Sequence, residues 1–166
     1  AFGFTMSTGS SVSAATSGNF TLYLQNTTDV AYNKGTNWAT IPTGMTTCFA
    51  NIMTIPLSAS STSILITLST PYVYTGGGLY VAYDWYSAGP YSTTPATYWA
   101  ENSVFTAGCA SSVSATSAPG SLTTTNFRPA FLFGFNNPYT NDVTVYAVEA
   151  PGRIAGTIGT PHSVSA

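Results

Sequence analysis

The residues that could carry out catalysis are few in this chain. The 166 residues include one histidine, His162, and five carboxylates, Asp29, Asp84, Glu101, Asp142 and Glu149. A Ser-His-Asp or Cys-His arrangement needs an imidazole beside its nucleophile, and His162 lies in a Pro/Gly-rich segment close to the end of the sequence. We therefore expect that the chain is not an enzyme, and we assign no catalytic residue.

Metal binding is a second use for carboxylates. A calcium ion takes about six to eight oxygen ligands, which backbone carbonyls and two carboxylates in a loop can supply. Asp29 is the candidate ligand because it lies in a long polar segment, from Thr27 to Gly44, although the chain has no D-x-D-x-D-G run. We expect no cofactor, with Ca²⁺ at Asp29 as the alternative. Asp84 and Glu101 are instead candidates for an ion pair with Arg128, whose charge lies within an apolar stretch.

Aromatic residues gather around one expected loop, at Trp85, Tyr86, Tyr91, Tyr98 and Trp99. Sugar-binding sandwiches stack aromatic rings on pyranose rings and bind the hydroxyls with Asp, Glu and Asn. The candidate glycan-binding set is therefore Asp84, Trp85, Trp99, Glu101 and Asn102. The alternative is that these strand aromatics fill the core. Solvent exposure of the two tryptophans distinguishes the two interpretations.

The two cysteines, Cys48 and Cys109, are expected to form a disulfide. A chain low in charge and rich in Ser and Thr is typical of extracellular proteins, in which paired cysteines are usually oxidised. Closing so long a loop would stabilise the fold by about 4 kcal/mol in the chain-entropy model. The alternative is two separate buried thiols.

The composition excludes several partners. Hydrophobic residues make up 44% and aromatic residues 14% of the chain, whereas charged residues make up only 5%. So many aromatics are not typical of a disordered segment. Three Lys and Arg residues cannot form a phosphate-binding stripe, so we expect no nucleic-acid binding. No apolar run approaches the about 20 residues of a membrane span, so we expect no membrane insertion. Ser, Thr, Asn and Gly must provide the wettable surface.

The fold prediction is centred on Ile64–Trp85, where two stretches alternate apolar and polar residues on either side of Gly76–Gly78. This pattern predicts two strands joined as a hairpin, with Leu79, Val81, Tyr83 and Trp85 on one face. Similar alternation predicts further strands at residues 2–6, 19–26, 45–53, 96–102, 126–135 and 142–149. No helical periodicity occurs, so we expect an all-β protein, an antiparallel β-sandwich of jelly-roll type.

Two long polar segments, Thr27–Gly44 and Asn102–Thr125, are expected to be loops, and Trp38 is expected to plug one end of the sandwich. The expected domain covers residues 1–149. Residues 150–166 form a Pro/Gly linker followed by the first strand of another module.

Four segments together resemble a known family. Tyr74–Val81 (YTGGGLYV) is similar to the Y-x-G-G-x-L-x-V signature of a β-sandwich domain in large secreted proteins of Bacteroidota. Tyr23–Thr28 (YLQNTT) resembles its upstream (Y/F)-L-x-N-T-T segment, and Leu122–Pro129 (LTTTNFRP) its L-T-x-x-N-x-R-P segment. Gly159–Ala166 (GTPHSVSA) resembles the passage into a following immunoglobulin-like repeat. In order, these matches cover nearly the whole chain.

The resemblance implies a non-catalytic module of a multidomain cell-surface adhesin, exported by the type IX route and acting in attachment or gliding. The resemblance also implies an additional strand before residue 1. The expected location of the module is extracellular, at the cell surface. Its expected partners are neighbouring domains of the same chain and an extracellular surface or glycan. The alternative function is a carbohydrate-binding module that uses exposed Trp and Tyr side chains.

Overall fold

The computed structural model describes residues 1–6, 15–56, 63–89, 100–102, 107–113, 117 and 119–134. All of them belong to the first of the two units into which the chain divides, Ala1–Phe135 and Asn136–Ala166. The strand expected at residues 142–149, the linker and the start of a following module lie outside the described residues.

The described part of the chain is all-β and contains no helix, as predicted. Its strands pair antiparallel. They are β1 (Phe2–Thr5), β2 (Thr16–Thr27), β3 (Thr46–Ile55), β4 (Ser63–Ile66), β5 (Gly78–Tyr86), β6 (Ala100–Asn102), β7 (Cys109–Ser111), β8 (Thr123–Thr125), β9 (Phe127–Pro129) and β10 (Phe131–Phe133).

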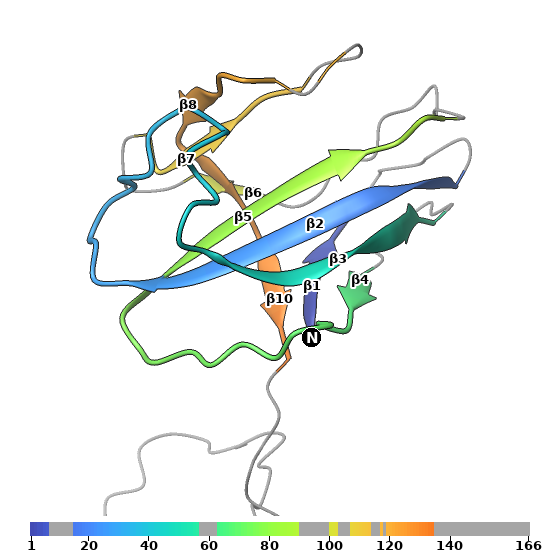
Figure 1. Cartoon of the computed structure of the whole chain (residues 1–166), viewed down its shortest axis with the longest axis horizontal. Helices are drawn as coiled ribbons and strands as arrows, with labels where there is room; N and C mark the ends of the chain where they lie inside the picture. The colour runs from blue at the N-terminus through green and yellow to red at the C-terminus, as the bar shows by residue number, and fades with distance from the viewer. Residues whose placement is uncertain are drawn as a thin grey trace, which may run out of the picture. The chain divides into compact units, whose positions relative to one another are not determined.

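Two three-stranded sheets, in the orders β10-β1-β4 and β3-β2-β5, face each other across the core. Figure 1 shows the strands of the second sheet running across those of the first. The alternation of β2 places Phe20, Leu22 and Leu24 in the interior. Phe4 of β1 meets this layer edge-on, with its ring centroid 5.8 Å from that of Phe20 and 5.4 Å from that of Tyr83. These contacts make the unit sandwich-like.

The predicted hairpin between Ile64 and Trp85 is wrong. β4 pairs with β1, and β5 pairs with β2, so the two strands belong to opposite sheets. Period-two patterning identifies a strand but not its partner, and the intervening residues 67–77 are long enough to cross the roughly 10 Å between packed sheets. The backbone N–H groups of Ser69 and Thr70 donate to the Cys48 carbonyl at 2.9 and 3.1 Å, which holds this crossing segment against β3.

Cys48 itself lies in a β-bulge. The pairing register shifts between Leu22, which lies opposite Phe49, and Tyr23, which lies opposite Thr47, so Cys48 is the extra residue. Its side chain is completely buried in the core. The bulge thus both turns a thiol inward and presents the carbonyl that anchors the crossing segment.

The segments expected to be loops contain structure as well. β7 and β8 pair within the predicted loop Asn102–Thr125, and the Trp38 and Leu122 amides bond the carbonyls of Gly120 and Thr36 at 3.1 and 2.7 Å. Trp38 does not plug an end of the sandwich. Its ring packs on Tyr23, 6.2 Å away and edge-on, on the side of β2 that faces away from the core.

Candidate functional site

The predicted glycan-binding set is not assembled as expected. Asp84 and Trp85 are neighbours on β5, so their side chains point to opposite faces. Asp84 is exposed, whereas Trp85 is half-buried and packs against the core, so the two cannot bind one sugar together. Trp99 lies outside the described residues. Glu101 and Asn102 belong to β6, which pairs with β9 rather than with the strand of Asp84.

The backbone register supports the predicted ion pair in one of its two forms. Glu101 lies directly opposite Arg128 between β6 and β9, whereas Asp84 lies opposite Thr21 between β5 and β2. Opposite charges at facing positions of an antiparallel pair attract each other. The Glu101–Arg128 pair therefore stays a prediction, and the Asp84 alternative is not supported by the register.

The outer face of the β3-β2-β5 sheet carries the polar side chains that alternate with the core residues. A shallow hollow of about 210 Å³ lies at one end of this face, lined by Asn19, Ile52 and Tyr86 together with Ser17 and Ala88. Tyr86 is 66% exposed and Ile52 is 64% exposed, although both are large and partly or wholly apolar. The period-two pattern places Tyr86, and not Trp85, on the same face as Asp84. This alternation is the sequence signal that could have identified Tyr86 as the exposed aromatic residue.

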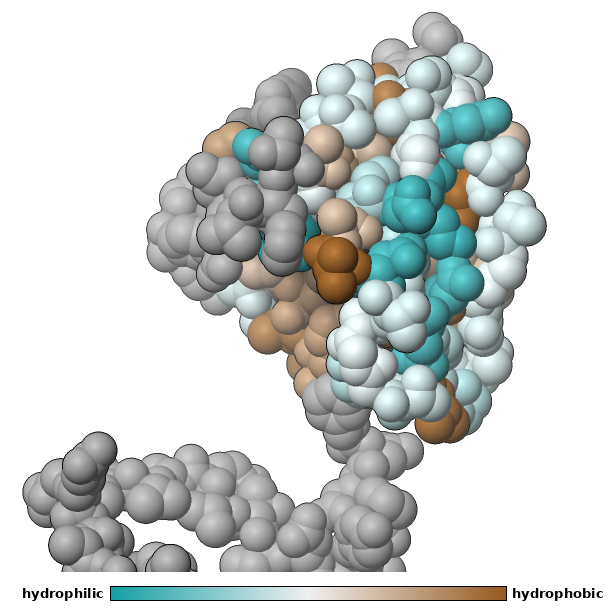
Figure 2. Space-filling model, turned by 90° about the vertical axis from the view of Figure 1, so that its left-hand side faces the viewer, coloured by the Kyte–Doolittle hydropathy of each residue, from teal (hydrophilic) through white to brown (hydrophobic). Residues whose placement is uncertain are grey.

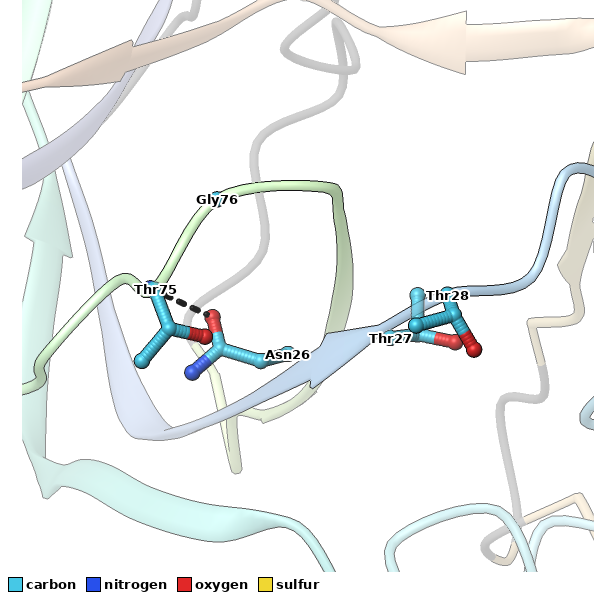
Figure 3. Close-up of a pocket in the computed structure, with 5 residues that line it drawn as sticks. All are labelled: Asn26, Thr27, Thr28, Thr75 and Gly76. Atoms are coloured by element: carbon cyan, nitrogen blue, oxygen red, sulfur yellow. Dashed lines mark hydrogen bonds between the residues drawn. The ribbon is translucent and has the colours of Figure 1, made fainter.

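A second hollow, of about 340 Å³, lies at the opposite end of the β2–β5 pair and is lined by Asn26, Thr27, Thr28, Thr75 and Gly76. Figure 3 shows the Asn26 side chain reaching across to the backbone of Thr75. The Asn26 amide nitrogen donates to the Val73 carbonyl at 3.0 Å, and its oxygen accepts from the Thr75 N–H at 3.4 Å. Two of the segments that carry the family resemblance, Tyr23–Thr28 and Tyr74–Val81, therefore meet here.

The glycines of this turn are required by its geometry. Gly76 and Gly77 have φ values of 92° and 78°, which non-glycine residues rarely adopt. A Cβ on Gly78 would also lie 2.9 Å from the Thr27 methyl group. The Tyr74 hydroxyl donates to the Gly77 carbonyl at 2.5 Å and closes the turn.

Asp29 serves as an anchor for the Thr27–Gly44 segment. Its carboxylate accepts a hydrogen bond of 2.6 Å from the Tyr80 hydroxyl, which in turn accepts the Asn33 N–H at 3.0 Å. The Lys34 ammonium lies 5.6 Å from the centre of the Tyr80 ring. Burial, and then the hydrogen bond to Asp29, raise the pKa of Tyr80. Calcium binding at Asp29 stays a prediction; within the described ranges, no three His, Cys, Asp or Glu side chains gather in one place.

The predicted disulfide is not formed in this structure, where both cysteines are free thiols. Cys48 is enclosed in the core between the sheets. Cys109 is half-buried on β7, close enough to Tyr32 and Arg128 for their charges to interact. Burial raises the pKa of both thiols. Both thiols are free here, and the disulfide between them stays a prediction.

On the side of the unit that carries the Thr27–Gly44 segment, teal and white residues cover one part of the surface, and brown and tan residues adjoin one another beside the grey atoms (Figure 2). In the described part of the chain, nothing helical has the length and hydrophobicity that a membrane-spanning helix needs. Comparison with known proteins gives no further assignment: neither a family model, nor a curated protein, nor a solved structure matches this chain.

Proposed function

We propose that the chain is a non-catalytic module of a large secreted cell-surface adhesin, acting in attachment or gliding. The observation that carries this proposal is the outer face of the β3-β2-β5 sheet. Its side chains are hydroxyls, amides, phenols and aliphatic groups, and Asp84 is the charged group among the residues that this face presents on the three described strands. Such a surface suits binding by close contact rather than catalysis.

The low charge of this surface determines how attachment would work. With so few charges, long-range electrostatic steering is weak and salt has little effect on binding. Each contact depends on close approach and contributes little affinity by itself. Many copies acting together multiply weak affinity by a factor on the order of 100 or more. The proposed partners are accordingly neighbouring domains of the same chain and an extracellular surface, and the proposed route of export is type IX secretion.

The fold suits a module that bears mechanical load between neighbours. Its two sheets share a core in which aromatic rings from β1, β2, β5 and β10 contact one another across the layers. Hydrogen bonds of Asn26 and Asp29 also hold the segments that connect the strands. A rigid unit keeps its contact surface in one shape while the chain is pulled.

Carbohydrate binding is the second candidate function. The observation that favours it is the exposure of Tyr86 beside Asn19 and Ile52 in the hollow at the end of the outer face. In this case the ring that stacks on the sugar would be Tyr86, because Trp85 is turned toward the core.

Attachment of single and tandem copies tests the adhesin proposal. The full chain and an array of several copies are fixed to beads, and the retention of the beads on polysaccharide, on cells and on glass is measured under flow. We expect the array to be retained far longer than the single copy, with little change between low and high salt. Equal retention of both, or turnover of a substrate by the single copy, would contradict the proposal.

A further inference from the structure

We propose that the hollow at Asn19, Ile52 and Tyr86 binds one neutral pyranose ring of an extracellular glycan. The inference deepens the attachment function and rests on it, because it names the class of surface that the module would recognise. The hollow is distinct from the Asp84–Trp85 site expected from the sequence, since it uses the opposite face of β5 from Trp85.

One row of residues across the sheet forms the hollow. Asn19 of the central strand β2 lies opposite Ile52 of β3 on one side and opposite Tyr86 of β5 on the other. Neighbouring strands are about 4.8 Å apart, so the row spans about 10 Å. The next row along this face, Ala50 and Thr21 beside Asp84, has small side chains at its first two positions. Ile52 and Tyr86 thus form two walls around the shorter Asn19.

The chemistry of the row matches a sugar ring. Tyr86 presents an exposed aromatic face, on which the C–H groups of a pyranose can stack. The Asn19 amide offers both donors and an acceptor, and sugar hydroxyls need both. Among the described residues, no hydrogen bond to the Asn19 side chain or to the Tyr86 hydroxyl is present, and Tyr86 is 66% exposed. The volume of about 210 Å³ is below the usual range for drug-sized ligands and suits a single ring.

The rim of the hollow is held rigidly, which reduces the entropic cost of binding. The buried Ser87 hydroxyl donates to the Ser17 carbonyl at 2.7 Å and accepts the Gly89 N–H at 3.2 Å. Gly18 lets the chain that follows Tyr86 approach β2, because a Cβ there would lie 2.4 Å from the Tyr86 carbonyl oxygen. The position of the Tyr86 ring is therefore set by the backbone on both sides.

Charge selects neutral sugars over acidic ones. Asp84 lies two residues from Tyr86 on the same face, about 7 Å along the strand, and it is exposed. No residue lining the hollow is cationic. A uronic or sialic acid carboxylate would meet the Asp84 charge without a compensating cation, whereas the hydroxyls of a neutral ring can donate to Asp84.

The test is a titration of the isotope-labelled full chain with cellohexaose, mannohexaose and galactohexaose, followed by amide chemical shifts, with hexagalacturonate as the acidic control. We expect at least one neutral oligomer to shift the amides of residues 17–19, 52 and 86–89, and the acidic oligomer to shift none of them. Tyr86→Ala should weaken binding by about tenfold or more, as expected for loss of a stacking contact of this kind. Tyr86→Phe keeps the ring and should bind within about twofold of the native chain.

Phe127→Ala is the matched control, because Phe127 is an exposed aromatic, 59% accessible, on β9 away from the hollow. It should leave affinity unchanged. The inference is wrong if no neutral oligomer binds, if the shifts lie elsewhere, or if Phe127→Ala weakens binding as much as Tyr86→Ala. Retention of the tandem array separates the two proposals. An array that attaches equally well with Tyr86→Ala contradicts the sugar site alone, whereas sugar binding without any advantage of the array contradicts the attachment function alone.

Discussion

Replacing Asn26 by alanine should loosen the crossing segment that connects the two sheets. The Asn26 side chain bonds the Val73 carbonyl at 3.0 Å and the Thr75 N–H at 3.4 Å, and it is the side chain drawn reaching over the hollow in Figure 3. Both bonds join β2 to the segment that passes from one sheet to the other. Asn26→Ala removes them without touching the core.

The size of the effect follows from these distances. A net hydrogen bond contributes about 0.5–1.5 kcal/mol to stability. The 3.4 Å contact is close to the limit for a hydrogen bond and adds little. Val73 is 75% exposed, so its carbonyl regains water after the substitution and no buried group is left unpaired. We therefore expect a loss of about 1 kcal/mol, which lowers the melting temperature of a domain of this size by about 2–4 °C.

Urea unfolding measures the loss in stability, and amide hydrogen exchange at residues 73–78 locates it. Asn26→Asp keeps the acceptor for Thr75 but loses the donor to Val73, so it should show most of the effect. Asn33→Ala is the control, because it is the Asn33 backbone amide that makes its hydrogen bond, and it should leave stability nearly unchanged. If Asn26→Ala unfolds at the native urea concentration and exchange at residues 73–78 is unaltered, the assignment of this bond as a clamp is wrong.

Three further predictions concern stability and the thiols. Gly3→Ala should destabilise the unit, because its Cβ would lie within 2.3 Å of the Ile64 carbonyl oxygen, whereas Gly120→Ala, with nothing within 4 Å, should not; thermal melts compare the two. Alkylation of the denatured, unreduced chain should modify both Cys48 and Cys109. In the native state Cys109 should react first, because Cys48 is fully buried. An intact mass that shows neither thiol modified would mean that the two cysteines form the disulfide. The free energy of unfolding should fall as pH rises above about 9 to 10. Groups whose pKa is higher in the folded state keep their protons there, whereas in the unfolded state they lose them at a lower pH, so high pH favours unfolding. Spectrophotometric titration with parallel urea melts checks this, and the groups with raised pKa values are Cys48, Cys109, Tyr23, Tyr32, Tyr72 and Tyr80.

The sequence determined the strands better than their pairing. Alternation correctly predicted the buried face of β2, since Phe20 and Leu22 are in the core, and it separated the two faces of β5, on which Tyr86 is exposed. It could not show that β4 and β5 belong to opposite sheets, because a strand has the same period whichever partner it has. β7 and β8 were missed because three-residue strands of Cys, Ala, Ser and Thr contain too few apolar residues to alternate.

The glycan-binding set predicted from the sequence is not the set of residues that the structure brings together. A cluster of aromatics beside a loop drew attention to the end of β5, where the predicted set includes Trp85, which packs against the core. Which of two adjacent aromatics faces solvent depends on the opposing sheet, where Phe4 and Phe131 contact Tyr83 on the inward side of β5. The disulfide prediction relied on composition, and composition carries no information on the bulge that turns Cys48 into the core.

The two hollows of the β2–β5 pair have separable roles because they lie at its opposite ends. Thr27 pairs with Gly78 at one end and Asn19 with Tyr86 at the other, about 27 Å apart along extended strands. Two of the four segments that carry the family resemblance, Tyr23–Thr28 and Tyr74–Val81, meet at the first end, where the Asn26 side chain bonds the backbone of Val73 and Thr75. We therefore expect the first end to stabilise the fold and the second end to bind the ligand. Substitutions at distant sites act additively, so Asn26→Ala should lower stability without changing sugar affinity, and Tyr86→Ala should do the reverse. If the double variant loses more or less stability or sugar affinity than the two single variants together, the Asn26 hydrogen bonds also affect the shape of the binding hollow.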